Sequence, residues 1–379
     1  WIFYYVFTVY AALFFYKLYR LLRRKGIPVL GTFILIFVLS YWTIDAGTNI
    51  RRSTSGLLNK NEKLESSDSE FLARFEEAGI NPNQYQAILF LPFANTCGDK
   101  LLFEKGMTAF SEAMKCSYHT GLPLVQSFSP RLSFTHALSS IQMLADSAIQ
   151  KTRLDAMNEN PLLLVCTKEK INKSEAWLQS KATVFWEDKY ITLSTLPLSV
   201  FRESHQNWLD EVKRKKITLT GVEDIMSDSD SPSLIYNGFE NELGEFVFSG
   251  NGAFYAVKGQ FELLNEKLNT SFLEGKYEIS FWLYVDSRHY DMPGATLKIM
   301  REDNSFQEIR LNTREVHDVY NHWIRVSGMI DLHPNDRLQL IIKGDYISVD
   351  DLLVRRAESN ILVKASDNME LFNNYPFVP

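Results

Sequence analysis

Aromatic and acidic side chains alternate with apolar ones between residues 277 and 286. In an extended strand, alternate side chains point to opposite faces. One face would carry Tyr277, Ile279, Phe281, Leu283 and Val285. The other would carry Glu278, Ser280, Trp282, Tyr284 and Asp286. Aromatic rings pack on the apolar face of a sugar, and carboxylates accept hydrogen bonds from its hydroxyl groups. The second face is therefore predicted to bind carbohydrate, with Tyr290 extending it.

The same pattern has a second interpretation, in which another domain or a neighbouring strand covers Trp282 and Tyr284. Two further aromatic residues bear on the choice between the two. Tyr320 would enlarge a binding surface, whereas Trp323 begins a strand, where a tryptophan commonly anchors the packing. Both interpretations stay open at the level of the sequence.

A second set of polar residues lies between residues 104 and 136. His119 and Arg131 are predicted to line a polar groove, and Glu104, Glu112 and His136 are further candidates for general acid–base chemistry. The sequence contains no glycine-rich phosphate loop and no HExxH or GxSxG motif, so no spacing demands a catalytic role. Solvated surface residues or structural polar contacts account for the same set more simply.

Three cysteines are too few to build a disulfide-stabilised scaffold in a chain of 379 residues. Cys97 and Cys116 are predicted either to form a disulfide or to be free buried thiols. Cys166 lies within an apolar run and is expected in the core. None of them has the paired spacing of a zinc site.

Two apolar stretches precede the polar part of the chain. Residues 1–16 are uncharged, and residues 26–44 supply 19 more uncharged positions. Because a helix needs ~20 apolar residues to cross a bilayer, residues 1–45 are predicted to form two transmembrane helices. The basic cluster at residues 17–25 lies between them, so the positive-inside rule places this loop in the cytoplasm and everything after about Asp45 outside, in the periplasm or at the cell surface. A signal peptide fits less well, because no basic segment precedes the first apolar run.

Charge divides the chain in the same way. The net charge of -6 combines +4 for residues 1–48 with -10 for the remainder, which argues against general nucleic-acid binding. The length predicts two or three domains. Because the chain opens within apolar sequence, we expect it to be the C-terminal part of a longer polytopic protein.

Beyond a polar connector at residues 46–79, residues 80–215 alternate apolar runs with amphipathic segments. Strands are predicted at 85–93, 121–125, 161–167, 183–186 and 190–196, and helices at 103–115, 133–157 and 201–213, with Ser133 as N-cap of the second helix. This alternation predicts an α/β domain. Residues 217–357 instead contain eight short alternating runs bounded by Gly, Asn and Asp, which predict an all-β sandwich or jelly roll. Residues 358–379 are expected to form a tail lying across a domain surface.

The segments Ala87–Phe93 and Tyr118–Arg131 (YHTGLPLVQSFSPR) resemble the extracytoplasmic C-terminal region of bacterial GT-C-type glycosyltransferases. The resemblance covers roughly residues 1–210. It implies a polytopic enzyme that uses a lipid-linked sugar donor. The catalytic carboxylate of that family lies in an early outer loop, upstream of Trp1, so no residue of this chain inherits its role.

A second resemblance begins at Asn237–Glu240 (NGFE) and continues through the strand YEISFWLYV, the segment Trp323–Ser327 and the closing strand Ile347–Val354. These segments resemble β-sandwiches of the carbohydrate-binding-module type. The resemblance implies that Glu240 and Asp350 help to hold a structural Ca²⁺, which prefers oxygen ligands. Many sandwiches of this type bind no sugar, so the fold alone does not decide the function.

Together these features predict the C-terminal portion of a multispanning membrane glycosyltransferase whose outer domains assist sugar transfer and bind glycan. Its expected partners are the lipid bilayer and a glycan or polysaccharide, and not nucleic acid. The alternative is a non-catalytic, membrane-tethered cell-envelope protein whose sandwich binds polysaccharide or protein.

Overall fold

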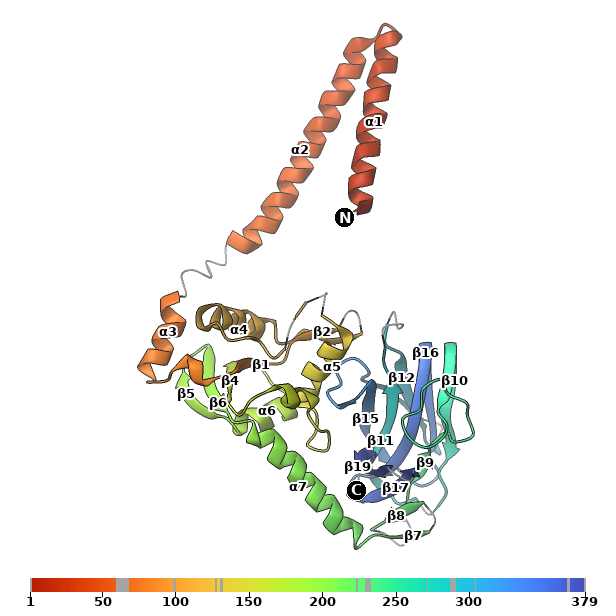
Figure 1. Ribbon diagram of the computed structural model, residues 1–379. Helices are drawn as coiled ribbons and strands as arrows, with labels where there is room; N and C mark the ends of the chain where they lie inside the picture. Colours follow the sequence, from red (N-terminus) through yellow and green to blue (C-terminus); the bar gives the residue numbers. More distant parts are fainter. Residues whose placement is uncertain are drawn as a thin grey trace. The chain divides into compact units, whose positions relative to one another are not determined.

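The computed structural model describes residues 2–58, 68–97, 100–126, 128–129, 132–222, 224–228, 233–270, 272–286, 291–303, 305–366 and 369–377. The chain divides into two compact units, residues 1–67 and 68–379. Each unit is described by itself below (Figure 1).

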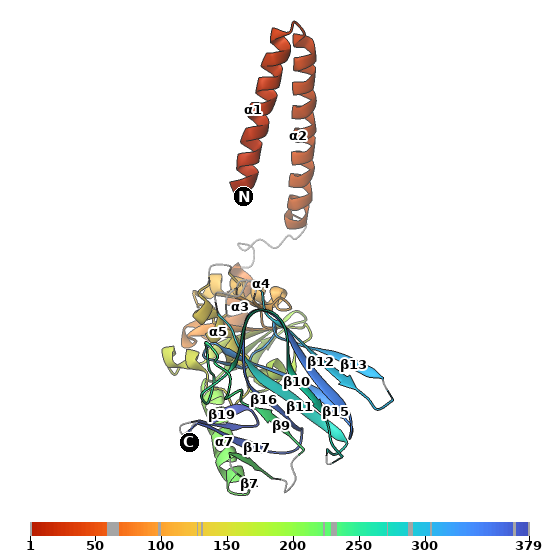
Figure 2. The ribbon, with the colours of Figure 1, turned by 90° about the vertical axis from the view of Figure 1, so that its right-hand side faces the viewer.

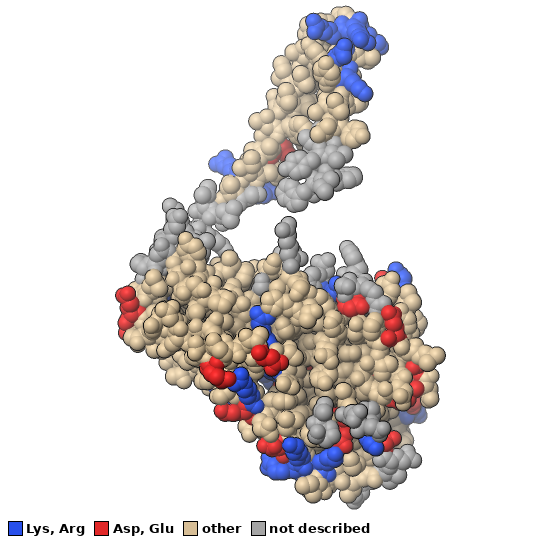
Figure 3. All heavy atoms as spheres, in the orientation of Figure 1, with Lys and Arg blue, Asp and Glu red and all other residues tan. Residues whose placement is uncertain are grey.

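The first unit is a helical hairpin. Helix α1 (Ile2–Arg24) packs along helix α2 (Pro28–Leu58), and Gly26 joins them with φ 76°, a conformation that favours glycine. Basic side chains gather at this turn, while the sides of the hairpin are mostly uncharged (Figure 3). Among the described residues, one stretch, Pro28–Arg52, is long and apolar enough to cross a membrane, as either a membrane anchor or a signal sequence would be. The other predicted span includes residues 1–8, whose side chains lie outside the described part, and stays a prediction.

The second unit begins with an α/β layer. Its main sheet has the strand order β1-β4-β6-β5, in which β1 and β4 are parallel and the other pairs antiparallel. These strands are β1 (Ala87–Leu91), β4 (Leu162–Thr167), β5 (Thr183–Glu187) and β6 (Ile191–Leu196). The helices are α3 (Asp68–Glu77), α4 (Met107–Thr120), α5 (Phe134–Ile141), α6 (Lys173–Ser180) and α7 (Ser199–Lys216). Every residue of β1 and β4 is buried, as expected for strands covered on both faces.

Three short elements complete this layer. A hairpin joins β2 (Asn95–Cys97) to β3 (Leu101–Phe103), and a 3-10 turn, Pro82–Gln84, precedes β1. The strand predicted at residues 121–125 reduces to one parallel bridge between Ile88 and Leu124. Cys116 and Cys166 are free buried thiols, and burial raises the pKa of each to about 12. The side chain of Cys97 lies outside the described residues.

The long helix predicted over residues 133–157 is wrong beyond its first two turns. Ser133 does cap α5, because its hydroxyl accepts a hydrogen bond from the amide of His136 at 3.3 Å. The chain then continues as two 3-10 turns, Gln142–Leu144 and Thr152–Ala156, separated by a loop. In this loop the buried ammonium of Lys151 donates to the carbonyls of Ala145, Asp146 and Ile149, at 2.8, 2.6 and 2.8 Å. Carbonyls bonded to a side chain in this way do not form a helical ladder.

The rest of the unit contains a β-sandwich built around one long strand, β16 (Arg337–Arg356). Along one edge β16 pairs with β10 (Phe254–Lys267) and then β9 (Ile235–Asn237), and along the other with β12 (Gly294–Met300) and then β11 (Gly275–Tyr284). The outer strands are β13 (Phe306–Leu311), β14 (Val319–Tyr320) and β15 (Trp323–Leu332). Figure 2 shows the long strands of this sandwich running side by side.

Residues 358–379, predicted as a tail, provide strands of a third sheet with the order β19-β18-β17-β8-β7. Its strands are β7 (Thr220–Val222), β8 (Ile225–Ser227), β17 (Ile361–Ser366), β18 (Met369–Phe372) and β19 (Tyr375–Phe377). Helix α7 runs from the α/β layer to this sheet, where its Val212 packs against Leu362, Phe372 and Phe377 (Figure 1). The last described strands therefore complete the hydrophobic core.

The α/β layer and the sandwich are joined by a buried junction. The Gln142 amide donates to the Val319 carbonyl at 2.7 Å, and the backbone amide of Asp146 donates to the Asp318 carboxylate at 2.8 Å. The ring of His317, in the loop before β14, stacks on Phe103 with 4.6 Å between ring centroids. These contacts explain why the two layers form one compact unit.

Candidate functional site

The two predicted faces of β11 exist, but most of the face predicted to bind sugar is covered. Trp282 is 0% exposed, its ring stacks on Phe248 with 4.3 Å between centroids, and its Nε1 donates to the carbonyl of Asn374 at 3.1 Å. Segment 246–248 and strands β17–β19 form this cover. The prediction that Trp282 contacts sugar directly is therefore wrong, and the interpretation in which a neighbouring strand covers this ring is the one observed.

The open end of this face forms a pocket, which we call the aromatic pocket. Tyr284 pairs with Trp323 across β11 and β15, and Trp323 pairs with Tyr320 across β15 and β14. Directly opposed residues on neighbouring strands share a face, so three aromatic side chains form one row. The pocket has a volume of about 300 Å³ and is lined by Val247, Phe248, Tyr284, Tyr320, Asn321, His322, Trp323 and Met369.

The two-residue turn between β14 and β15 shapes the polar rim of this pocket. Asn321 adopts φ 54°, a left-handed conformation that asparagine tolerates better than most residues. Its side chain is exposed, and the half-buried His322 stacks on Tyr284 with 6.0 Å between ring centroids. The rim therefore offers an amide and an imidazole beside the aromatic row.

The remaining residues predicted on this face have different positions. The Glu278 carboxylate is the counter-ion of two arginines, Arg325 at 2.9 Å and Arg355 at 2.7 Å. It therefore balances buried positive charge and is not part of the aromatic pocket. Asp286 is half-buried just beyond the end of β11. Tyr290 lies outside the described residues, and its predicted role stays a prediction.

The predicted polar groove is not assembled among the described residues. The half-buried ring of His119, near the end of α4, stacks on Phe71 of α3 with 6.4 Å between centroids. Glu112 pairs with Lys115 at 2.8 Å, and His136 lies on α5, where burial lowers its pKa. Arg131 lies outside the described residues. These positions favour the structural interpretation of His119.

The two acids predicted to hold calcium converge on one turn. One Asp350 oxygen accepts hydrogen bonds from the amides of Phe248 and Ser249, at 2.9 and 3.2 Å, and Glu240 accepts one from the amide of Asn251 at 2.6 Å. Asp350 and its neighbour Asp351 are both 0% exposed, and burial together with the charge of a neighbouring carboxylate raises the pKa of each.

The arrangement does not by itself form a metal centre. Among the described residues, no group of three or more His, Cys, Asp or Glu side chains has the geometry to hold a metal ion. The carboxylate oxygens are already satisfied, since Asp351 accepts from the Tyr236 and Ser249 hydroxyls at 2.6 and 2.7 Å. The calcium site at Glu240 and Asp350 stays a prediction.

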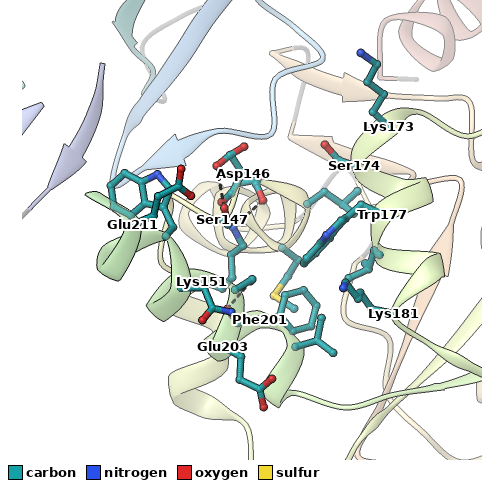
Figure 4. A pocket seen from close by; sticks show the side chains of 18 residues that line it. Asp146, Ser147, Lys151, Lys173, Ser174, Trp177, Lys181, Phe201, Glu203 and Glu211 are labelled. Atoms are coloured by element: carbon teal, nitrogen blue, oxygen red, sulfur yellow. Dashed lines mark hydrogen bonds between the residues drawn. The ribbon is translucent and has the colours of Figure 1, made fainter. Parts of the chain in front are cut away.

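Several residues around these sites were missed by the sequence reasoning. Asn321 and His322 form the turn of the aromatic pocket, and the run Tyr-Asn-His-Trp at 320–323, two polar residues between two aromatic ones, was the available signal. A larger cavity, of about 520 Å³, opens in the α/β layer between α6 and α7 (Figure 4). Its residues come from three separate segments, so no local motif marked it.

No protein-family model matches the sequence, and no curated protein matches it. About a third of the chain is similar to solved carbohydrate-binding domains. One is the CBM22-1 xylan-binding domain of Paenibacillus barcinonensis Xyn10C, with 12% identity and a TM-score of 0.24 over 34% of this chain and 96% of that one. Another is a Xyl-CBM35 domain in complex with a disaccharide that contains glucuronic acid, with 11% identity and a TM-score of 0.24 over 36% and 96%. A third is the CBM6cm-2 module of Cellvibrio mixtus lichenase 5A in complex with cellotriose, with 9% identity and a TM-score of 0.20 over 34% and 94%.

Proposed function

We propose that this chain is a membrane-tethered glycan-binding protein, and that the aromatic pocket of its sandwich holds one sugar unit of the glycan. The observation that supports this most directly is the row of Tyr284, Trp323 and Tyr320 across three neighbouring strands. An apolar wall of rings beside a few polar groups is the usual composition of a small-ligand pocket. The exposed Asn321 amide would donate to, and accept from, the hydroxyl groups of a stacked sugar.

The pocket is positioned by a rigid scaffold. The Phe246 ring stacks on Tyr284 with 4.0 Å between centroids, and Trp323 meets Tyr284 edge-on at 5.3 Å. Rings fixed in this way lose little conformational freedom when a ligand binds, which favours affinity. Tyr320 lines the pocket and is half-buried, whereas Trp323 is only 6% exposed, so the Tyr320 ring is the more accessible of the two to a ligand.

A binding experiment with matched variants tests this proposal. The full chain, in lipid nanodiscs to avoid sugar detergents, is titrated with xylan, cellotriose and β-1,4-galactotriose. We expect binding to at least one of them, weakened roughly three- to tenfold by Tyr320→Ala because one stacking surface is lost. Tyr190→Ala is the control, because Tyr190 is 64% exposed and lies in the α/β layer. Equal affinities of the wild type and Tyr320→Ala for every glycan would show that the aromatic pocket does not hold the sugar.

Two finer predictions extend this proposal. The first is that both helices of the N-terminal hairpin span the membrane, which would keep residues 68–379 at the outer surface. The second is that the chain belongs to a glycosyltransferase of the GT-C type and assists sugar transfer from a lipid-linked donor. Among the described residues we assign no catalytic group, so the non-catalytic tethered binder is the form we propose.

A further inference from the structure

The cavity of about 520 Å³ in the α/β layer lies between two helices whose facing side chains differ in charge. Helix α6 and the residue after it present Lys173, Trp177 and Lys181, each four positions from the next. Helix α7 presents Glu203, Asn207 and Glu211 at the same spacing. Residues four apart lie on one face of a helix, so each wall of the cavity is a continuous stripe. We call this cavity the α6–α7 groove (Figure 4).

Trp177 is the central residue of the basic wall. Its side chain is 39% exposed, and Figure 4 shows its ring turned into the groove. Covering the open part of an aromatic ring with a ligand is favourable, because apolar surface is removed from water. The ring therefore offers an apolar face to a ligand in the groove.

Most of the charged side chains on the two walls form no ion pair within the described part of the protein. Among the described residues, Lys173, Lys181 and Glu203 form no ion pair, and Glu211 pairs with Lys215 of its own helix at 2.6 Å. The walls thus carry opposite charges without neutralising each other across the groove. One wall offers hydrogen-bond donors, and the other offers carboxylate and amide acceptors.

The floor of the groove is held rigidly. The three hydrogen bonds from Lys151 fix the loop that contains Asp146 and Ser147, and the His205 ring of α7 is hydrogen-bonded through Nδ1 to the Ser147 carbonyl at 2.8 Å. Met143 and Phe201 supply a buried apolar base. A site with fixed walls and floor binds a ligand at low ordering cost.

We propose that the α6–α7 groove is a second saccharide-binding site, with Trp177 as its stacking platform and a neutral oligosaccharide as its ligand. A neutral sugar ring matches both walls, because its hydroxyl groups both donate and accept hydrogen bonds. The edge facing α6 accepts hydrogen bonds from the ammonium groups of Lys173 and Lys181. The edge facing α7 donates to Glu203 and Asn207. A charged sugar would be attracted by one wall and repelled by the other, whereas a neutral sugar forms hydrogen bonds with both.

The test uses the full chain in lipid nanodiscs and neutral hexasaccharides of glucose, mannose, galactose and xylose as probes. Saturation-transfer NMR detects contact, and calorimetric titration gives the affinity. We expect at least one probe to bind, with roughly tenfold weaker affinity in Trp177→Ala and partial recovery in Trp177→Phe. Lys181→Gln and Glu203→Gln should each weaken binding roughly three- to tenfold, because each removes a charged hydrogen-bond partner while keeping the shape. Thermal melting confirms that each variant folds.

Variants elsewhere separate this groove from the aromatic pocket. Binding that survives Tyr320→Ala and Tyr190→Ala but is lost in Trp177→Ala supports the groove. Binding that is unchanged in Trp177→Ala overturns it, whatever Tyr320→Ala does, and so does the absence of contact with all four probes. A hexagalacturonate that binds more tightly than the neutral probes would overturn the assignment of a neutral ligand.

Discussion

At the scale of single residues, the structure assigns different roles to side chains that look alike in the sequence. Trp282 and Trp177 are both predicted or candidate partners of a sugar ring, yet the first is 0% exposed and the second 39%. The difference follows from what covers each ring, Phe248 and the last strands in one case and an open groove in the other. The local sequence does not contain this information, because the covering residues lie far away along the chain.

The acids around residue 350 lead to a prediction about metal. Asp350 and Asp351 are buried side by side, which is unfavourable unless a proton or a cation compensates for their charge. If Ca²⁺ binds there, it binds the folded state only, and a concentration of about 100 times its dissociation constant would add ~2.7 kcal/mol to the free energy of unfolding. If the predicted calcium site exists, CaCl₂ will therefore raise the melting temperature of the chain and EDTA will lower it.

The controls for this measurement are carboxylates exchanged for amides. Asp350→Asn should abolish the response to Ca²⁺, whereas Glu242→Gln should keep it, because Glu242 is exposed. A melting temperature that does not respond to Ca²⁺ or EDTA in the wild type would exclude the predicted calcium site.

At the scale of secondary-structure elements, the loop before β14 connects the sandwich to the α/β layer through His317. Its ring stacks on Phe103 and meets Phe93 edge-on at 5.6 Å. Burial lowers the pKa of His317 to about 4, from 6.5. The folded junction therefore contains the neutral imidazole at every pH at which the protein is normally studied.

This shift predicts how stability depends on pH. Between about pH 6.5 and pH 4 the unfolded chain binds a proton at His317 and the folded chain does not, so acid favours unfolding. We expect this residue alone to lower the free energy of unfolding by roughly 1–3 kcal/mol between pH 7 and pH 4.5. Urea unfolding of wild type and His317→Phe at both pH values measures it. The loss should be smaller in the variant, and equal losses would contradict the shift.

The elements also show which parts of the fold the sequence could specify. Apolar runs predicted β1 and β4, and alternation predicted both faces of β11, because burial patterns are local. The helix predicted over residues 133–157 failed because the side chain of Lys151 turns back onto three carbonyls, which no periodicity shows. The covering of Trp282 and the facing stripes of the α6–α7 groove depend on tertiary packing, so local patterns could not predict them.

At the scale of the whole molecule, the charge of the chain predicts its orientation. The turn between α1 and α2 is basic, and short basic loops stay in the cytoplasm. If both helices cross the membrane, residues 68–379 are outside the cytoplasm, where free polysaccharide or envelope glycan is accessible. This orientation is a condition for the proposed function.

Protease treatment of intact cells, or of spheroplasts where an outer membrane is present, tests this orientation. We expect protease to release a large fragment of the 68–379 unit, because this unit is accessible from outside in that orientation and is compact by itself. A cysteine introduced at the exposed Ile27 should react with a membrane-impermeant reagent only after the cells are opened. Protection of residues 68–379 combined with labelling at residue 27 in unopened cells would reverse the orientation and exclude an extracellular glycan as ligand.

The hydrogen bond from Trp282 to Asn374 joins residues 92 positions apart in the chain, and strands β17–β19 close the cover over that ring. During translation, Trp282 can therefore be fully buried only after residue 374 has left the ribosome. Until then the apolar surface around Trp282 is exposed and can associate with other incompletely folded chains. Contacts between residues so far apart in the sequence also form slowly. We therefore expect chains truncated after β16, which lack strands β17–β19, to depend on chaperones more strongly than the full chain does.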